Sequence, residues 1–401
     1  MMDNILNAPL PLLPIDYVFT GENSYQIEFV FVFNYRIDAN RLKDALDKLL
    51  VSFYPLRSKL KKIPPDDLAI APANDGFVYE VIESTEKTFS ADPHVYLNTV
   101  VTMENEPLGK LRLTQTPAGS VLGISIAHFV ADGFSTFYFL GELAKAYQNK
   151  EITPPEIKRS WFTSQRAQSK EKITAEDIIR QTGFSGPFPR KEVSRDRIVW
   201  ENITVPNDKI QQILADAQKE SSIRLTKNDV LSAYLSKTYI TRWQNDKPLD
   251  KAYITSPFDI RRFSDLVSGN YFGNGICLMT VEMEYDWFLK ASVSRLAQKI
   301  RATINKINKE YVINYYNVME QYRHQEGLLK MQQLHVAHPY AGILATNLSR
   351  VPLELCDFGQ GKPTRFMALT PSPRGAIMLP GQNGIKVDVC FPFFSNTDKM
   401  T

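Results

Sequence analysis

The chain of 401 residues has few cysteines, and their spacing limits its chemistry. The 3 cysteines, Cys277, Cys356 and Cys390, are far apart and form no Cys-x-x-Cys pair. Neither a disulfide framework nor a zinc site is therefore expected. Cys277 and Cys390 lie in apolar runs that are typical of small core residues. We expect no bound metal and a reducing, cytoplasmic environment.

Long apolar runs and blocks of like charge are also missing. The longest apolar run, Ile27 to Phe33, contains Glu28 and is too short to span a bilayer. Met1 to Leu13 has no basic region followed by a long apolar stretch, so no signal peptide is expected. Lys and Arg total 47 and Asp and Glu total 44, a net charge of +3 without a basic block. Neither a membrane nor a nucleic acid is expected as a partner.

What the chain does contain is a mixture of strand and helix patterns in both halves. Runs of apolar, β-branched and aromatic residues predict strands over 24–35, 76–82, 111–115, 121–129, 198–205, 252–256, 275–282, 342–347 and 385–391. Helical spacing of apolar residues predicts helices over 38–53, 134–147, 174–181, 208–220, 291–307, 311–332 and one that starts at Thr226. The fold class is therefore α/β or α+β.

A change of composition divides the chain into parts. Prolines interrupt a stretch rich in Lys, Arg, Gln and Ser, which indicates a long crossover linker over 151–197. The length of the chain suits two domains of about 200 residues each. We therefore predict an N-terminal domain over 1–150 and a C-terminal domain over 198–401, each with a mixed sheet and flanking helices.

His128 is the candidate catalytic residue, in the segment His128-Phe-Val-Ala-Asp132-Gly133. The strand before it has small residues at one parity and bulky residues at the other, and the bulky face ends in the imidazole. Gly133 can adopt a positive φ, so the chain could reverse there and start the next helix. A core histidine bonded to backbone is the plain alternative. Metal binding is disfavoured because no third ligand is nearby in the sequence.

The ordinary pKa of histidine suits a general base that takes a proton from a hydroxyl or an amine. If the acceptor substrate is itself the nucleophile, the protein needs no nucleophilic serine or cysteine. The sequence offers no good one: Gly123-Ile-Ser125-Ile-Ala127 lacks the last glycine of a nucleophile elbow and lies within a strand. A serine hydrolase is therefore disfavoured.

Several further segments accompany His128 along most of the chain. They are Leu13 to Asp16, Phe53 to Leu56, Leu225 to Ala233, Asp259 to Arg261, Asn270 to Asn274, Thr346 to Leu348, and Asp357-Phe-Gly-Gln360-Gly361. In this order they resemble landmarks of the BAHD acyltransferases, an acyl-CoA-dependent family with the signatures His-x-x-x-Asp-Gly and Asp-Phe-Gly-Trp-Gly. The resemblance implies two chloramphenicol-acetyltransferase-like domains with a channel between them in which acyl-CoA and the acceptor meet at His128.

The resemblance also implies roles for single residues. His128 would deprotonate a small-molecule alcohol or amine, which then attacks the thioester without a covalent enzyme intermediate. Thr346 is the candidate donor to the oxyanion, with Asn274 as a further oxyanion or substrate contact. Lys227, at a helix N-terminus, and Arg350 are candidates for holding CoA. Acyl-CoA would be a co-substrate, with no tightly bound cofactor, and we expect a monomer.

The remaining signature residues are expected to support the site rather than to react. Asp132 would pair with Arg261 and so hold the turn that aims the imidazole. Asp357, Gly359 and Gly361 would be architectural, like Gly133.

Two substitutions depart from the family signatures. Gln360 replaces the Trp of the second signature, which suggests a divergent or microbial branch. Leu348 replaces the Trp of a Thr-Ser-Trp segment and removes an aromatic wall, so plant acceptors such as shikimate are not carried over. The resemblance itself implies a role in secondary metabolism. One alternative is a condensation-type domain that takes its acyl group from a carrier protein. Such domains usually have a second His where this chain has Ala127. Another alternative is an inactive binding protein of the same fold.

Overall fold

The computed structural model describes residues 9–65, 67–73, 75–163, 172–190, 198–242, 249–372 and 374–392. The chain forms two compact units. Unit 1 contains Met1–Ser164, Ser264–Gly275 and Val351–Thr370, and unit 2 contains Gln165–Phe263, Ile276–Arg350 and Pro371–Thr401. The sequence-based domains were each continuous, whereas the structure assigns two segments of 198–401 to unit 1. The segment Asp357 to Gly361 is among them.

The linker expected over 151–197 contains two helices in its described part. They are α4 (Ser160–Thr163) and α5 (Ala175–Thr182), the second of which agrees with the predicted helix over 174–181. Residues 164–171 and 191–197 of the linker lie outside the described residues.

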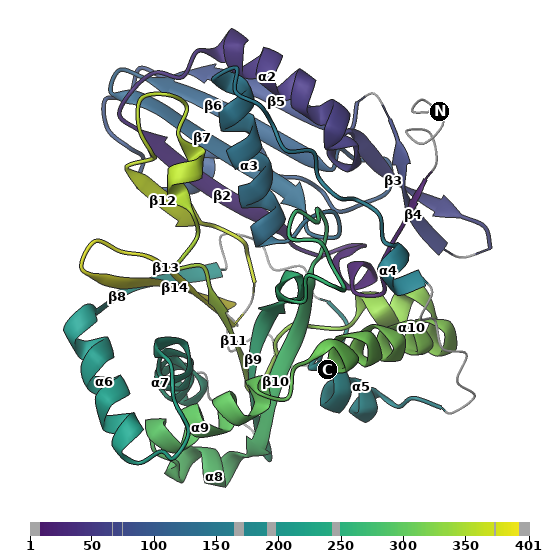
Figure 1. Ribbon diagram of the computed structural model, residues 1–401, viewed down its shortest axis with the longest axis vertical. Helices are drawn as coiled ribbons and strands as arrows, with labels where there is room; N and C mark the ends of the chain where they lie inside the picture. Colours follow the sequence, from purple (N-terminus) through teal and green to yellow (C-terminus); the bar gives the residue numbers. More distant parts are fainter. Residues whose placement is uncertain are drawn as a thin grey trace, which may run out of the picture. The chain divides into compact units, whose positions relative to one another are not determined.

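Unit 1 is built on a five-stranded sheet with the strand order β12-β2-β7-β6-β5 (Figure 1). Its strands are β2 (Gln26–Phe33), β5 (Phe77–Glu83), β6 (Gly109–Thr116), β7 (Gly119–Ala127) and β12 (Arg365–Ala368). A smaller sheet consists of β1 (Leu10–Pro11), β4 (Asp67–Pro72) and β3 (Ser58–Ile63). The described part of unit 1 also has short 3-10 helices, which are η1 (Asp16–Phe19), η2 (Tyr54–Arg57), η3 (Pro93–Tyr96) and η6 (Leu353–Cys356).

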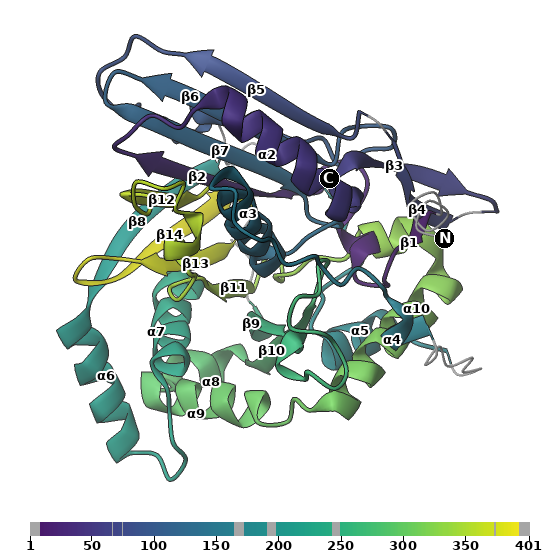
Figure 2. The same ribbon diagram turned by 45° about the horizontal axis from the view of Figure 1, so that its top comes forward.

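Helices α2 (Ala39–Ser52) and α3 (Gly133–Tyr147) lie on the same face of the larger sheet (Figures 1 and 2). Asp38 is the N-cap of α2, and its carboxylate accepts a hydrogen bond from the Arg41 amide at 2.8 Å. The ring of Phe137 on α3 lies 5.1 Å from that of Phe29 on β2, centroid to centroid. This aromatic contact joins the helix layer to the sheet.

The opposite face of β7 is covered closely by backbone, which explains its small residues. A Cβ atom added to Gly123 would lie 1.9 Å from the carbonyl oxygen of Tyr96. The hydroxyl of Ser125 accepts a hydrogen bond from the Val100 amide at 3.0 Å. The small parity of the strand is therefore set by the segment from Tyr96 to Val100, and His128 lies at the other parity.

Unit 2 is built on a six-stranded sheet with the order β10-β9-β11-β13-β14-β8. Its strands are β8 (Ile198–Pro206), β9 (Lys251–Asp259), β10 (Ile276–Glu284), β11 (Gly342–Asn347), β13 (Gly375–Pro380) and β14 (Gly384–Pro392). Its larger helices, besides α5, are α6 (Asn207–Lys219), α7 (Lys227–Arg242), α8 (Tyr285–Lys290), α9 (Val293–Ile304) and α10 (Lys309–Gln332), and the 3-10 helix η5 covers Ile260–Arg262.

Alternate residues of the central strands of unit 2 point into one apolar core with α7 and α9. The residues of β11, β13 and β14 that do so are Ile343, Ala345, Ala376, Met378, Val387 and Val389. Cys390, at the other parity of β14, is also buried. Thr226 and Asp229 form a capping box at the start of α7, where the sequence predicted a helix to begin. Thr226 N donates to the Asp229 carboxylate at 2.7 Å, and Asp229 N donates back to the Thr226 hydroxyl at 3.4 Å.

The mixed fold class is confirmed, and the elements that the sequence missed are mostly short or atypical. The omitted strands are β1, β3, β4, β12 and β13, and the omitted helices include α8. Strand β13 is central in its sheet, yet Gly375-Ala-Ile-Met-Leu-Pro380 shows no alternation between polar and apolar residues because both of its faces are buried. None of the helices in the described ranges combines the length and hydrophobicity that crossing a bilayer requires.

The close packing of the Tyr96 backbone against β7 leads to a prediction about stability. Replacing Gly123 by Ala should lower the free energy of unfolding by about 2 kcal/mol or more, because the new methyl group overlaps the Tyr96 carbonyl. Gly269, also in unit 1, is the matched control, since a Cβ atom there meets nothing within 4 Å. Urea unfolding of both variants checks this; an equal, small effect of the two would contradict the packing described.

Candidate functional site

His128 directly follows β7 and is enclosed by aromatic rings of unit 1. Its exposed fraction is 8%. The imidazole stacks on the ring of Phe19, with centroids 3.9 Å apart and planes at 5°. The ring of Tyr25 is nearly perpendicular to the imidazole, with centroids 5.9 Å apart. A hydrogen bond from Val130 N to Ala127 O, 2.9 Å long, closes the turn that carries the histidine. The ring is therefore held flat between β7 and η1.

Asn274 contacts His128 through both ends of its amide group. The side-chain nitrogen of Asn274 donates to the backbone carbonyl of His128 at 2.7 Å and to Asp16 Oδ1 at 2.8 Å. A carbonyl oxygen can only accept, so this assigns the nitrogen and oxygen of the amide. The amide oxygen then lies 3.1 Å from His128 Nδ1, which must carry a proton to bond with it. Nε2 is left with its lone pair, and no described residue hydrogen-bonds to it.

Asp16 is a fully buried carboxylate behind Asn274. Its Oδ2 accepts hydrogen bonds from Arg159 at 2.6 Å and from the Leu13 amide at 2.8 Å, and Arg159 also donates to the Pro11 carbonyl at 2.7 Å. Burial raises the pKa of the Asp16 carboxyl, and the Arg159 guanidinium acts in the opposite direction by favouring the carboxylate. Asn274 is therefore held on one side by a buried charge pair and on the other by the histidine.

Asp132 links the histidine turn to the segment that carries Asn274. It is the N-cap of α3, accepting from Ser135 N at 2.8 Å through one carboxylate oxygen. Its other oxygen accepts from Gly275 N at 2.8 Å. The Ser135 hydroxyl donates to the Gly273 carbonyl at 2.9 Å, which fastens the same segment a second time. One carboxylate thus positions both the helix start and the residue next to Asn274.

Gly133 does not act as expected. It is the first residue of α3 and is not among the glycines with positive φ, so the chain does not reverse there. The reversal takes place earlier, between Ala127 and Val130, and any helix-forming residue has the backbone conformation that position 133 requires.

The surroundings of His128 also change its acidity. Burial lowers the pKa of the imidazole below 6.5, while its own backbone, the charge of Asp132 and the hydrogen bond with Asn274 partly oppose this. The neutral ring is therefore the dominant form at neutral pH. A neutral imidazole with a free Nε2 lone pair is the form that a general base requires.

The expected role of Asn274 differs from its geometry. It was expected to bind an oxyanion or substrate, but its amide hydrogens are directed at the His128 carbonyl and at Asp16. A primary amide has only two hydrogens to donate. The side chain therefore positions His128.

Asp357, Gly359 and Gly361 form a tight loop at the other end of α3. Asp357 Oδ1 accepts from the Gly359 amide at 2.6 Å and from the Gly361 amide at 2.9 Å. Both glycines have a positive φ, +103° and +112°, which other residues rarely adopt. Gln148, at the C-cap of α3, donates to the Asp357 carbonyl at 2.6 Å. Since α3 has 15 residues, this loop lies about 22 Å along the helix from Asp132.

Gln360, the first departure from the signature, has an exposed side chain. The loop is held by Asp357 and by the Tyr35 hydroxyl, which donates to the Gly361 carbonyl at 2.8 Å. A polar residue at position 360 therefore fits the loop without a change in its backbone.

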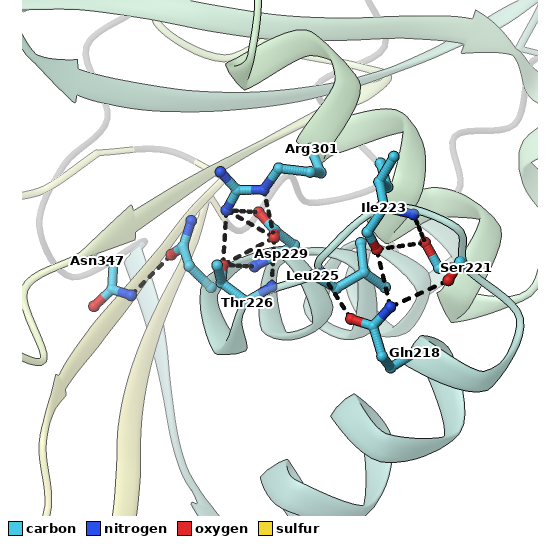
Figure 3. A network of polar contacts seen from close by, with 9 residues as sticks. Gln218, Ser221, Ile223, Leu225, Thr226, Asp229, Arg301 and Asn347 are labelled. Atoms are coloured by element: carbon cyan, nitrogen blue, oxygen red, sulfur yellow. Dashed lines mark hydrogen bonds and ion pairs between the residues drawn. The ribbon is translucent and has the colours of Figure 1, made fainter.

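The residues expected to meet acyl-CoA lie in unit 2, and some of them are close together there. Thr346 is near the end of β11, at the parity opposite the apolar core, and its hydroxyl makes no hydrogen bond to any described residue. Lys227 is the first residue of α7. Asn347 donates to Asn228 at 2.8 Å and so joins the end of β11 to the first turn of α7 (Figure 3).

Arg301 stabilises that first turn. Its guanidinium donates to both carboxylate oxygens of Asp229, at 2.9 Å each, and to the Thr226 hydroxyl at 2.8 Å. Figure 3 shows Arg301 of α9 against the capping box, apart from the contact with Asn347. Arg350, three residues beyond β11, is exposed.

Arg261 is buried within η5 of unit 2. Its guanidinium donates to Asp259 Oδ1 at 3.0 Å, and its amide donates to the same oxygen at 3.0 Å. The expected pair between Arg261 and Asp132 would join the two units, and it stays a prediction.

A model of the Transferase family matches residues 5–393. The chain belongs to this family, the BAHD acyltransferases. It is 26% identical over 386 residues to a hydroxycinnamoyltransferase of Narcissus pseudonarcissus, an alignment that covers 86% of this chain and 82% of the relative.

Solved structures show the same fold. TRI101 of F. sporotrichioides, complexed with coenzyme A and T-2, is similar with a TM-score of 0.74 at 14% identity, over 96% of this chain and 95% of that one. The first condensation domain of the CDA synthetase has a TM-score of 0.63 at 12% identity, over 98% and 92%. As a BAHD member the chain is an acyltransferase for groups other than aminoacyl groups, with the mixed two-domain architecture expected from the resemblance.

Several residues around His128 were not expected from the sequence. Asp16 belonged to the landmark segment Leu13 to Asp16, but no role was predicted for it. Phe19 was not a candidate residue, and Arg159 lay in the polar segment predicted as a linker. The described residues contain no group of three or more His, Cys, Asp or Glu side chains that could share a metal ion.

Two other histidines, His335 and His338, are mostly buried. His335 Nε2 must donate to the Phe188 carbonyl, 3.0 Å away, and His338 Nδ1 accepts from the amides of Tyr340 and Ala341. Burial lowers the pKa of each to about 4, and the charges of Arg190 beside His335 and Arg374 beside His338 act in the same direction. Both rings are therefore neutral in the folded protein at neutral pH.

Because the pKa values of His335 and His338 are lowered on folding, we expect the protein to lose stability in acid. In the unfolded chain they take up protons near pH 6.5, whereas in the folded chain they do so near pH 4. The free energy of unfolding should therefore fall between about pH 6.5 and pH 4 and stop falling on their account below that, by roughly 1–3 kcal/mol for each ring. Urea unfolding at stepped pH checks this.

His338→Asn keeps a side-chain acceptor but removes the titrating ring, so its acid loss should be smaller than that of the unmodified protein. His324→Asn, at an exposed position of α10, is the matched control. Identical pH dependence of the two variants would contradict the assignment.

Proposed function

We propose that this chain transfers an acyl group from a CoA thioester to the hydroxyl or amine of a small-molecule acceptor, with His128 as the general base. The observation that supports this best is the environment of the imidazole. Asn274 bonds to its Nδ1 and leaves Nε2 as a lone pair, and burial keeps the ring neutral. Membership of the acyl-CoA-dependent family supplies the reaction class.

The proposed reaction needs no covalent enzyme intermediate. The acceptor gives its proton to His128 Nε2 while its oxygen or nitrogen attacks the thioester carbonyl carbon. The carbonyl oxygen becomes an oxyanion, toward which the Thr346 hydroxyl is the expected donor. When the tetrahedral intermediate collapses, the carbon–sulfur bond breaks, and the thiolate takes the proton from His128 to leave as free CoA. The base is then neutral again.

Each positioning residue has a defined part in this proposal. The imidazolium formed during the reaction stays bonded through Nδ1–H to the Asn274 oxygen, so the ring does not rotate between the two proton transfers. Asp16, held by Arg159, keeps the Asn274 amide from flipping. Asp132 holds the backbone next to Asn274.

CoA itself is expected to contact unit 2. Lys227 lies at the N-terminus of a 16-residue helix, where a side-chain charge and the helix dipole both favour a phosphate. Arg350 is exposed and follows β11 by three residues, and Asn228 and Asn347 tie β11 to the same helix turn. We propose Lys227 and Arg350 as the CoA-binding residues.

A condensation-type reaction with a carrier-bound donor is the competing proposal, because a condensation domain shares the fold. Ala127, the position of a second histidine in such domains, is fully buried here. A second competitor is a binding protein without catalysis. Incubating the pure chain with acyl-CoAs and pooled alcohols and amines, and detecting the free CoA thiol, separates the three. Turnover without a carrier protein supports the BAHD-type reaction.

Removing the base gives the sharpest mutational prediction. His128→Ala should lower the rate of CoA release by about 10²- to 10⁴-fold, the range expected when a general base is lost. The fold should survive, because the replacement removes a ring without introducing a clash. His324→Ala, on the exposed side of α10, is the control and should keep the full rate. An active His128→Ala variant would rule out the mechanism.

A further inference from the structure

A row of three side chains crosses the sheet of unit 2. Thr346 pairs with Ile377 between β11 and β13, and Ile377 pairs with Asp388 between β13 and β14. Paired residues of neighbouring strands point to the same face of a sheet. All three alternate with the residues that fill the apolar core under α7 and α9. Thr346 and Asp388 therefore share the opposite face.

The two polar ends of this row are a fixed distance apart. Neighbouring strands lie about 4.8 Å apart, so two steps place the Cα atoms of Thr346 and Asp388 about 10 Å from each other. Ile377, between them, is an apolar side chain with an exposed fraction of 5%. The distance between Thr346 and Asp388 is one that a single extended molecule can span.

Asp388 is a buried carboxylate with an incomplete set of partners. Its exposed fraction is 4%. Lys386, two residues earlier on the same strand face, lies 3.1 Å from Oδ1 and 3.4 Å from Oδ2, but only the Oδ2 contact has the geometry of a hydrogen bond. Within the described part of the chain, Oδ1 accepts no hydrogen bond. Burial raises the pKa of this carboxyl, and Lys386 only partly opposes that.

Such a carboxylate weakens the folded state unless something completes its hydrogen bonding. A buried polar atom that accepts no hydrogen bond costs about 1–3 kcal/mol, and the ion pair with Lys386 offsets part of this cost. An apolar side chain would avoid this cost among neighbours such as Ile377 and Cys390. The position of Asp388 is therefore better explained by a ligand group that donates to Oδ1 than by the stability of unit 2.

We propose that Asp388 is a specificity-determining residue that accepts a hydrogen bond from a hydroxyl or ammonium group of a substrate. This rests on the proposed function, in which Thr346 meets the reacting carbonyl. The recognised group lies about 10 Å from that carbonyl. The recognised group is a hydroxyl or ammonium in either case, and it belongs either to the acyl chain or to the acceptor.

The test uses two sets of eight-carbon probes, whose extended length suits the spacing. In the acceptor arm, acetyl-CoA is combined with octanol, octane-1,8-diol or 8-aminooctanol. In the donor arm, octanoyl-CoA, 8-hydroxyoctanoyl-CoA or 8-aminooctanoyl-CoA is combined with one short alcohol. Free CoA release gives kcat/KM for each probe. One arm should show a preference of roughly tenfold or more for the hydroxyl- or ammonium-terminated probe.

Two variants assign that preference to the carboxylate. Asp388→Leu should abolish it, because no acceptor atom remains. Asp388→Asn keeps an acceptor oxygen without the charge, so the ammonium preference should fall several-fold more than the hydroxyl preference. Asp216→Asn, an exposed carboxylate of α6, is the control and should keep both preferences. A preference that survives in Asp388→Leu, or one that is absent from both arms of the unmodified protein, overturns the proposal.

A binding measurement separates this proposal from the proposed reaction. Calorimetric affinities of the same probes for the unmodified protein and for Asp388→Asn do not depend on turnover. If no probe turns over but the polar-terminated probes bind more tightly through Asp388, the proposed reaction fails and the recognition stands. If all probes turn over and bind alike, the reaction stands and the role of Asp388 is wrong.

Discussion

The site in unit 1 depends on a single primary amide. Asn274 lies 146 positions from His128 in the sequence, yet it bonds to both the backbone and the ring of the histidine. The two bonds together fix where the imidazole lies, which nitrogen carries the proton and which carries the lone pair. A hydrogen bond to the backbone alone would hold the turn but leave the ring free to rotate. The Asn274 amide holds the turn and also fixes the orientation of the ring.

The rest of the unit explains how this amide is held. Asp16 and Arg159 form a buried charge pair on one side of the Asn274 amide. The short helix η1, which carries Asp16, also carries Phe19, whose ring stacks on the His128 imidazole. Asp132 and Ser135 hold the segment Ser264–Gly275 against the start of α3. Buried charges of this kind are costly on their own, so their combined arrangement points to a site whose geometry has been favoured over stability.

The sequence predicted the parts of this fold that have a periodic pattern. The strand before His128, the helix after it and the helices that start near Asp38 and Thr226 were all foreseen, because alternation and helical spacing are local properties. The fully buried β13 was missed since its two faces look alike. The sequence did not show that Ser264–Gly275 and Val351–Thr370 belong to unit 1, because no local pattern records which unit a distant segment joins.

The site was predicted less completely than the fold. His128 was found from its place at the end of a strand, and family resemblance directed attention to Asn274 and Asp132. Their contacts could not be foreseen. Asn274 was expected near an oxyanion, and only the three-dimensional position of the His128 carbonyl shows that its hydrogens are already used. Asp16 and Arg159 are far apart in the sequence, and an ion pair over 143 positions leaves no local pattern.

If Asn274 fixes the tautomer of His128, the proton of the neutral imidazole must lie on Nδ1. Nitrogen-15 NMR of the protein labelled in its histidines reports which ring nitrogen of His128 carries the proton, with the His128→Ala spectrum identifying its signals. At neutral pH we expect a proton on Nδ1 and none on Nε2, and a loss of this single form in Asn274→Ala but not in the control Asn270→Ala. A proton on Nε2 of the unmodified protein would contradict it.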